Sequence, residues 1–178
     1  MAGRAPAPGP SARRAPAGAA VGGGRFAVVA ARFNERITKR LVAGALEAFS
    51  SAGVATEAVE IHWVPGSFEL PQAAAHLAAS GRFAAIVCVG CVIRGQTPHF
   101  DFVAGQAAAG IQHVALTSGV PATFGVITAL DEAQAWERAG GEVGNRGREA
   151  AEAALEMAAF VHEVRGGGQG THGKAKKG

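Results

Sequence analysis

Apolar and polar residues follow one another in blocks along the chain, and the blocks predict strands and helices in turn. Two almost wholly apolar runs, RFAVVAA at 25–31 and AAIVCVGCVI at 84–93, are typical of strands covered on both faces of a parallel sheet. The alternating stretch 54–64 predicts a half-exposed or edge strand, and PATFGVITA at 121–129 a further strand. The pattern therefore predicts four strands.

Helical spacing of apolar residues fills the intervals between these strands. Four main helices are expected, at 35–52, 71–80, 98–118 and 147–164. Because strands and helices alternate, we expect an α/β fold, a three-layer α/β/α sandwich around a four-stranded, mostly parallel sheet.

Polar residues at the predicted helix starts indicate caps. Asn34 is placed to cap the first helix and Thr97 the third, with Pro98 at its first position. Asp131 begins a short extra helix, with Gln134 three residues later as in a capping box. The glycine-rich segment 140–147 is expected to be a loop.

The two ends of the chain differ in composition from the part between them. Residues 1–24 are mostly Ala, Gly and Pro, and residues 166–178 are rich in Gly and Lys, so disorder is expected at both ends of a domain spanning 25–165. The ends hold six Lys and Arg residues and no acid, which leaves the domain with a formal charge of −3. The basic balance of the whole chain therefore does not indicate a nucleic-acid partner.

The expected location is the cytoplasm. The chain has no apolar stretch of membrane-spanning length, and residues 1–24 lack the apolar segment of a secretory signal. Arginines without acids also fit a transit peptide, but this segment has a single serine. Cys88 and Cys91 lie three apart in a predicted strand, so they should face opposite sides of the sheet. We therefore expect them to pack as small apolar side chains and not to form a redox or metal pair.

Polar chemistry gathers where the predicted strands end, above all in RGQTPHFDF at 94–102. In an open parallel sheet the carboxyl ends of the strands border the ligand crevice. A helix start near Thr97 suits a phosphate or another anion, and the positive helix end favours a neutral, basic imidazole at His99. Arg94 and Arg138 are candidate anion clamps, and Phe33 could stack on a planar ligand.

Plainer roles remain open for each of these residues. His99 could be a structural or solvated histidine, the arginines could be ordinary surface residues, and Phe33 could staple the following helix. The chain has no P-loop, no nucleophile elbow and no metal-ligand spacing of histidines. The residues together predict a cofactor-free α/β enzyme with a phosphate site, and they do not identify its substrate.

Five segments together resemble the 6,7-dimethyl-8-ribityllumazine synthase family. They are ARFNERIT (31–38), VPGSFELP (64–71), GCVIRGQTPHFDFV (90–103), FGVIT (124–128) and ERAGGEVGNRG (137–147), in the family's order and spacing. The resemblance implies a flavodoxin-like fold and a transferase of riboflavin biosynthesis that needs no metal or organic cofactor. Its substrates would be 5-amino-6-(D-ribitylamino)uracil and 3,4-dihydroxy-2-butanone 4-phosphate, and its products the lumazine, phosphate and water.

The resemblance also implies a role for each matching residue. His99 would transfer protons, and Gln96, Thr97 and Arg138 would bind the butanone phosphate. The pyrimidine substrate would contact Phe33, Asn34, Ser67, Phe68, Glu69, Cys91, Val92 and Ile93, with Phe124 supplied by a neighbouring subunit. Arg146 stands where many family members have lysine, which keeps the charge but changes the geometry.

Family members form pentamers with sites between subunits, and some build 60-subunit icosahedral shells. The short segment 139–147 favours a shell here over a free pentamer or a decamer, and association with riboflavin synthase is a further expectation. Two alternatives remain: an archaeal-type riboflavin synthase, against which 64–71 and 94–103 argue, and a flavin-binding or shell-forming relative without catalysis, against which His99, Arg138 and Phe33 argue.

Overall fold

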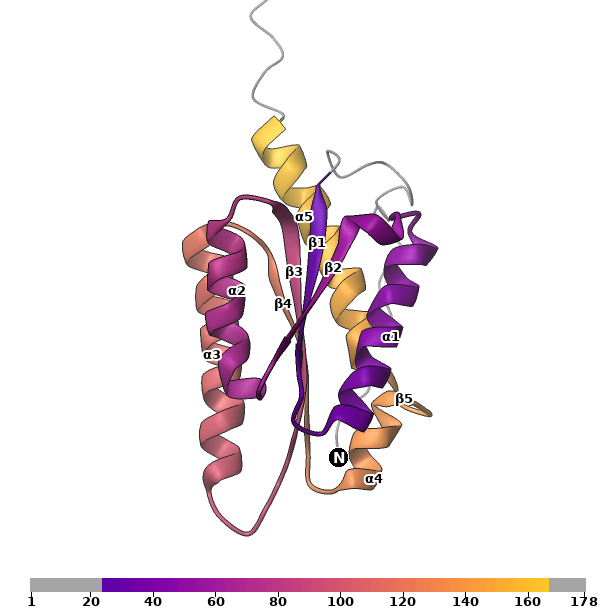
Figure 1. The fold of residues 1–178 in the computed structure, drawn as a ribbon, viewed down its shortest axis with the longest axis vertical. Coiled ribbons are helices and arrows are strands. Elements are labelled where there is room, and N and C mark those ends of the chain that lie inside the picture. Colours follow the sequence, from indigo (N-terminus) through magenta and orange to yellow (C-terminus); the bar gives the residue numbers. More distant parts are fainter. Residues whose placement is uncertain (1–23, 167–178) are drawn as a thin grey trace, which may run out of the picture.

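Four parallel strands form the middle layer of the fold (Figure 1). In the computed structural model, which describes residues 24–166, they are β1 (Arg25–Ala31), β2 (Val59–Val64), β3 (Phe83–Ile93) and β4 (Ala122–Ala129), in the order β2-β1-β3-β4. Each neighbouring pair is parallel, which confirms the predicted sheet. The strand expected at 54–64 begins only at Val59, because a 3₁₀ turn at Thr56–Ala58 precedes it.

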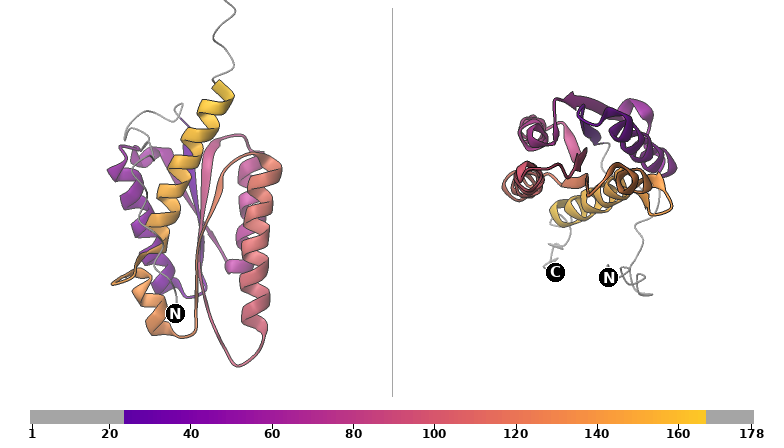
Figure 2. Two further views of the ribbon diagram at one scale, coloured as in Figure 1. Left: turned by 180° about the vertical axis from the view of Figure 1, so that it is seen from behind. Right: turned by 90° about the horizontal axis from the view of Figure 1, so that it is seen from below.

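Helices cover both faces of the sheet, as Figures 1 and 2 show. One face carries α2 (Leu70–Ala79) and α3 (His99–Ser118), and the other carries α1 (Glu35–Ser51) and α5 (Arg146–Gly166). The short helix α4 (Glu132–Glu137) follows β4 at the lower end of the view in Figure 1. This is the expected three-layer α/β/α sandwich of flavodoxin-like type.

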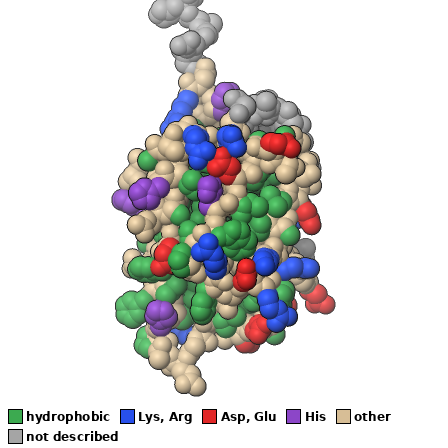
Figure 3. All heavy atoms as spheres, viewed as in Figure 1, with side chains coloured by type: hydrophobic (Ala, Val, Ile, Leu, Met, Phe, Trp, Pro, Cys, Tyr) green, Lys and Arg blue, Asp and Glu red, His purple; other side chains and the backbone are tan. Residues whose placement is uncertain are grey.

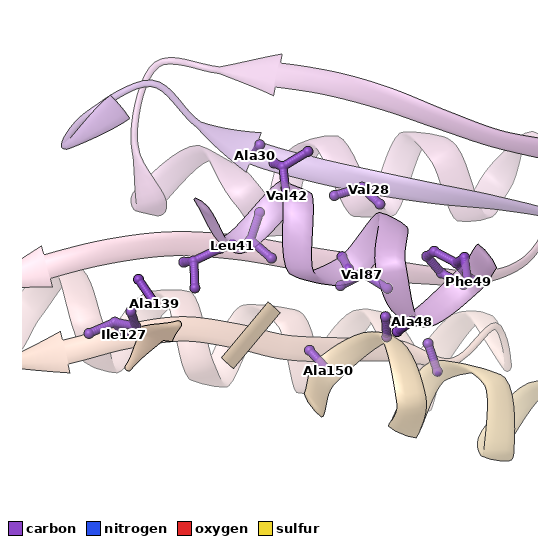
Figure 4. Packing of buried hydrophobic residues seen from close by; sticks show 14 of the residues in the cluster. Val28, Ala30, Leu41, Val42, Ala48, Phe49, Val87, Ile127, Ala139 and Ala150 are labelled. Carbon is purple, nitrogen blue, oxygen red and sulfur yellow. The ribbon is translucent and has the colours of Figure 1, made fainter. Parts of the chain in front are cut away.

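The core consists of two hydrophobic layers, one on each side of the sheet. Residues of β3 alternate between them: Val87 and Val89 pack with α1 and α5, while Ile86 packs with α2 and α3. Figure 4 shows the first layer, with Leu41 and Phe49 of α1 lying over the strands. Because both faces of β3 are covered, the strand needs the continuous apolar run seen in the sequence.

The two cysteines lie in opposite layers, Cys88 with α2 and α3 and Cys91 with α1 and α5. Both are free thiols, which confirms their expected packing as small apolar side chains. Burial raises the pKa of each to about 12, and for Cys91 the negative charge of Glu132 adds to the effect. The thiols are therefore kept neutral by the fold.

We expect the stability of the protein to fall with pH above 9.0, the ordinary pKa of the two thiols. The unfolded chain releases their protons there, whereas the folded chain holds them until pH approaches about 12, so this stabilising term is intact below 9.0 and is lost above it. The chain has no tyrosine to ionise in the same range. Urea unfolding on both sides of pH 9.0 measures the slope. A Cys88→Ala/Cys91→Ala variant should have a shallower slope, and an equal slope would exclude the thiols as its source.

Three local predictions are wrong in detail. Helix α3 begins at His99 with Pro98 as its cap residue, one position later than expected, and no side chain caps it. Asn34 precedes α1 but makes no capping bond, because its side chain is used elsewhere. The expected loop 140–147 is a hairpin of β5 (Ala139–Gly141) and β6 (Gly144–Asn145). The predicted cap of α4 is confirmed, since Asp131 Oδ1 accepts from the Gln134 N–H at 2.8 Å.

The terminal segments predicted to be disordered, 1–24 and 166–178, lie almost entirely outside the described residues. Within 24–166, no helix combines the length and the apolar character needed to cross a membrane.

Candidate functional site

At the carboxyl edge of the sheet, the lower end in Figure 1, backbone hydrogen bonds join the strands in two pairs, β1 with β2 and β3 with β4. After β1, the N–H groups of Arg32 and Phe33 donate to the carbonyls of Val64 and Pro65, at 2.8 and 3.1 Å, which ties this end to β2. Arg94, just after β3, donates its N–H to the Ala129 carbonyl of β4 at 2.9 Å. The polar segments that follow the strands are therefore held side by side.

The sheet opens between β1 and β3 at this edge. Pairing of β1 with β3 ends at Ala30↔Val89, whereas β3 continues beside β4 as far as Ile93↔Ala129. Residues 90–93 thus extend beyond β1 and leave a gap in the sheet where the strand order reverses. This is the position at which open α/β sheets bind ligands. Cys91, Val92 and Ile93 form one wall of it.

Asn34 closes the bottom of this gap. Its side-chain amide donates to the Cys91 carbonyl at 2.9 Å, and its backbone has φ 59°, the one positive φ of a non-glycine residue among those described. The left-handed conformation turns the chain sharply from β1 into α1 and aims the amide at β3. The Cys91 carbonyl, one of the backbone groups predicted to line the pyrimidine site, is therefore already hydrogen-bonded within the chain.

Two aromatic rings are exposed in the segments that follow β1 and β2. Phe33 is 71% exposed and Phe68 is 56% exposed, although both belong to ordered segments beside the strand ends. Hydrophobic side chains are visible on this side of the molecule in Figure 3, in the middle of the face and toward its lower end. Exposed rings beside the strand ends make this edge a candidate ligand or partner surface.

Ser67 is buried beside Gly90 of β3, and Glu69 follows in the same 3₁₀ turn, Ser67–Glu69. A Cβ atom on Gly90 would lie 2.5 Å from the Ser67 Oγ, so only glycine leaves room for the serine. Gly90 was not among the residues predicted from the sequence. A glycine inside an otherwise apolar strand was the available signal, because it commonly marks a close approach.

The segment 94–99 crosses from β3 to α3 and carries Gln96, Thr97 and His99 on its exposed surface. The Arg94 guanidinium lies 3.3 Å from an Asp101 carboxylate oxygen and 5.4 Å from the Phe100 ring centroid. Arg94 thus spans the loop and meets the first turn of α3. Its pairing with Asp101 is solvent-exposed, and its role as an anion clamp stays a prediction.

Phe124, Arg138 and Arg146 form a second group. Phe124 and Arg146 line a hollow of about 440 Å³ beside the outer edge of β4, together with Thr123, Val126, Glu149, Ala150 and Ala153. Arg146 pairs with Glu149 and donates its backbone N–H to the Arg138 carbonyl at 2.9 Å. The Arg138 guanidinium donates to the Gln134 carbonyl at 2.9 Å and is about one-third exposed.

One chain therefore presents two separate candidate surfaces. The first surface, at the gap between β1 and β3, has the aromatic rings, Ser67, Glu69 and His99. The second has Phe124 and the arginines. Within residues 24–166, no group of three His, Cys, Asp or Glu side chains is arranged to hold a metal ion.

Comparison with known proteins shows the family to which the chain belongs. Residues 23–162 match the sequence model of the 6,7-dimethyl-8-ribityllumazine synthase family. The chain belongs to this family. Lumazine synthases are transferases of riboflavin biosynthesis, and all five segments identified in the sequence lie within the matched region.

Three relatives named as lumazine synthases match most of the chain. The chloroplastic enzyme of Arabidopsis thaliana is 51% identical over 142 residues, covering 79% of this chain and 63% of that protein, less than two thirds of its length. The enzyme of Protochlamydia amoebophila is 49% identical, covering 75% of this chain and 77% of its own. The enzyme of Desulfatibacillum aliphaticivorans is 46% identical, covering 80% and 92%. These names support lumazine synthase over the two alternatives, an archaeal-type riboflavin synthase and a flavin-binding or shell-forming relative without catalysis.

Proposed function

We propose that the protein condenses 5-amino-6-(D-ribitylamino)uracil with 3,4-dihydroxy-2-butanone 4-phosphate to give 6,7-dimethyl-8-ribityllumazine, phosphate and water. The main support is the match to the lumazine synthase family over residues 23–162. The matching segments that follow the strands lie at the carboxyl edge of the sheet. The gap between β1 and β3, with an exposed ring beside it, suits a planar pyrimidine.

The pyrimidine substrate would bind at the first surface. Phe33 would stack on the pyrimidine ring. The free backbone N–H and C=O groups of residues 91–93 would form hydrogen bonds with the amide groups of that ring. Ser67, Phe68 and Glu69 would hold the pyrimidine and the ribityl chain, with Asn34 fixing the wall of the pocket. The hydroxyl and carboxylate supply the donors and acceptors that a polyol requires.

The butanone phosphate would bind between the start of α3 and Arg138. Helix starts present N–H groups and a positive dipole end to anions, and α3 is 20 residues long. Gln96 and Thr97 lie just before this start. Arg138 has donors left beyond the one that it gives to Gln134, and a guanidinium matches phosphate geometry. Arg146 would add positive charge beside it.

The reaction would begin with attack of the 5-amino group on the ketone and loss of water to form an imine. A proton then leaves, phosphate is eliminated, and the resulting enol becomes a ketone. The ribitylamino nitrogen attacks this ketone, and loss of a second water closes the ring. His99, exposed at the start of α3, would carry the protons between these steps. Holding both substrates in place would supply much of the remaining acceleration.

Complete sites would form between subunits of a homopentamer. The support is that Phe124 and Arg146 lie at the outer edge of β4, while the pyrimidine surface lies at the gap between β1 and β3. Large side chains are also exposed elsewhere: Phe102, Leu116, Leu130, Phe160 and Val164 are each more than half exposed. Sixty subunits in a shell remain the prediction for the full assembly, and mass photometry would distinguish it from five or ten.

Two further proposals concern the partner and the location of the protein. Association with riboflavin synthase is proposed because the product would be that enzyme's substrate. A cytoplasmic location is likewise a proposal. The Arabidopsis relative is described as chloroplastic, which keeps the transit-peptide alternative for the N-terminal segment open.

The activity is tested by mixing the purified protein with both substrates and following the absorbance of the lumazine. Formation faster than the uncatalysed condensation is the expected result. A rate equal to the uncatalysed one would overturn the proposed function and leave a binding or shell protein as the better account.

Arg138→Ala should raise the KM for butanone phosphate by about 10- to 100-fold, the equivalent of losing one charged hydrogen bond of about 1.5–3 kcal/mol. The KM for the pyrimidine should change little. Arg25→Ala is a matched control, because Arg25 begins β1 at the opposite end of the sheet. Steady-state kinetics with each substrate varied in turn makes the measurement. Equal KM values for Arg138→Ala and the wild type would remove Arg138 from the phosphate site.

A further inference from the structure

Asn145, between the β5–β6 hairpin and α5, bonds to two helices that are far apart in the sequence. Its Nδ2 donates to the Arg40 carbonyl of α1 at 3.0 Å. Its Oδ1 accepts from the N–H groups of Gly147 and Arg148 in the first turn of α5, at 2.9 and 3.1 Å. Asn145 thus caps α5 and also ties the cap to α1.

The asparagine fits against a helix surface that has no side chain. A Cβ atom on Gly44 of α1 would lie 2.4 Å from the amide carbon and Oδ1 of Asn145. Glycine in a helix interior normally costs stability relative to alanine. Gly44 is therefore explained by the space that it leaves for Asn145.

Asn145 also fixes the backbone beside Arg138 and Arg146, the two candidate phosphate-binding arginines. Asn145 pairs with Ala139 in the hairpin, directly after Arg138. Its other neighbour, Arg146, donates to the Arg138 carbonyl at 2.9 Å. Arg138 and Arg146 therefore lie on either side of one short hairpin, and the side chain of Asn145 holds that hairpin to α1.

We propose that Asn145 is a positioning residue for phosphate-substrate binding, acting through Arg138 and Arg146. This inference rests on the proposed function. A residue that only caps α5 would affect stability alone. A residue that sets the positions of two phosphate-binding side chains affects the KM of one substrate, because a guanidinium must lie at a defined place to bind phosphate.

Two variants disturb the tie to α1, and one of them keeps the cap of α5. Serine is an equally good cap residue and carries no charge, but it is too short to reach the Arg40 carbonyl, so Asn145→Ser keeps the cap and loses the tie. Gly44→Ala keeps the asparagine in the sequence but puts a Cβ atom 2.4 Å from its amide carbon, so the side chain must move. Gly105→Ala is the matched control, because Gly105 also lies in a helix and a Cβ there would meet nothing within 4 Å.

The experiment measures kcat, both KM values, inhibition by inorganic phosphate, and the melting temperature of each variant. In Asn145→Ser and Gly44→Ala we expect the KM for butanone phosphate to rise about 3- to 10-fold, as for one lost hydrogen bond, with weaker phosphate inhibition in parallel. The KM for the pyrimidine should stay at the wild-type value. Gly105→Ala should match the wild type in every kinetic constant.

The possible failures are distinct. An inactive wild-type protein overturns the proposed function and this inference with it. An active wild type whose two variants keep its KM and phosphate inhibition, and lose only melting temperature, overturns this inference alone. If one variant does not fold, the other decides, because the two act on the same contact from opposite sides.

Discussion

Replacing His99 with alanine should lower kcat by about 10²- to 10⁴-fold, the usual contribution of a positioned acid or base. His99 is the first residue of α3 and is exposed beside the strand ends, so it can reach a ligand in the gap between β1 and β3. Among the contacts within residues 24–166, none engages its ring in a hydrogen bond or an ion pair. The imidazole is available for proton transfer.

The loss should appear in kcat and not in folding. Alanine is the best helix former, so His99→Ala should leave α3 intact and the melting temperature close to that of the wild type. The limb of the pH–rate profile that belongs to the imidazole should disappear. Both KM values should change far less than kcat, because binding of phosphate and pyrimidine is assigned to other residues.

His113→Ala is the matched control for this experiment. His113 is exposed on the same helix, fourteen positions further on. Among the described residues, the one side-chain hydrogen bond made to it is accepted by its backbone carbonyl, and its ring makes none. The control should keep the wild-type rate. If His99→Ala keeps the wild-type kcat and pH profile, after subtraction of the uncatalysed condensation, another group must carry the protons.

The pattern of apolar residues was sufficient to predict the sheet and its helices. Strand β3 is buried on both faces, so it had to be continuously apolar, and β2 lies at an edge, so it could alternate. The hairpin at 139–145 was missed for a physical reason. Its glycines Gly140 and Gly144 have φ of 111° and 110°, and glycine in a sequence indicates a turn without indicating that strands pair beside it.

The candidate site residues could be named from the sequence, but their contacts could not be predicted from it. The side chain of Asn34 leaves the helix that it was expected to cap and bonds to Cys91, 57 positions away, and that of Asn145 bonds across 105 positions. Local preference gives the commonest role of a residue, and tertiary contact overrides it. Arg94 shows the same limit, since its Asp101 partner lies seven residues further on, beyond the loop.

Gly147→Ala should destabilise the protein by about 3 kcal/mol or more, the upper range for an overpacked core. A Cβ atom at this position would lie 2.0 Å from the Leu41 carbonyl oxygen and 2.6 Å from its carbonyl carbon. These are backbone atoms of α1, which cannot rotate away as a side chain can. Helix preference alone would favour alanine by about 1 kcal/mol, so the packing term decides the sign.

The close approach of α1 and α5 is also what joins the two candidate surfaces within a chain. Helix α1 follows Phe33 and Asn34 at the gap in the sheet, and α5 begins with Arg146. Forcing the helices apart at Gly147 should therefore weaken the binding of both substrates as well as the fold. This distinguishes Gly147→Ala from Asn145→Ser, which should affect the phosphate substrate alone.

Urea unfolding at one fixed protein concentration measures the loss, because the proposed assembly would make stability depend on concentration. Gly105→Ala again serves as the control and should be neutral or stabilising by up to about 1 kcal/mol. If Gly147→Ala proved as stable as this control, α1 and α5 would have to separate at little cost. The packing between the helices could then not be what positions Arg146, and the hairpin tie at Asn145 would have to do so by itself.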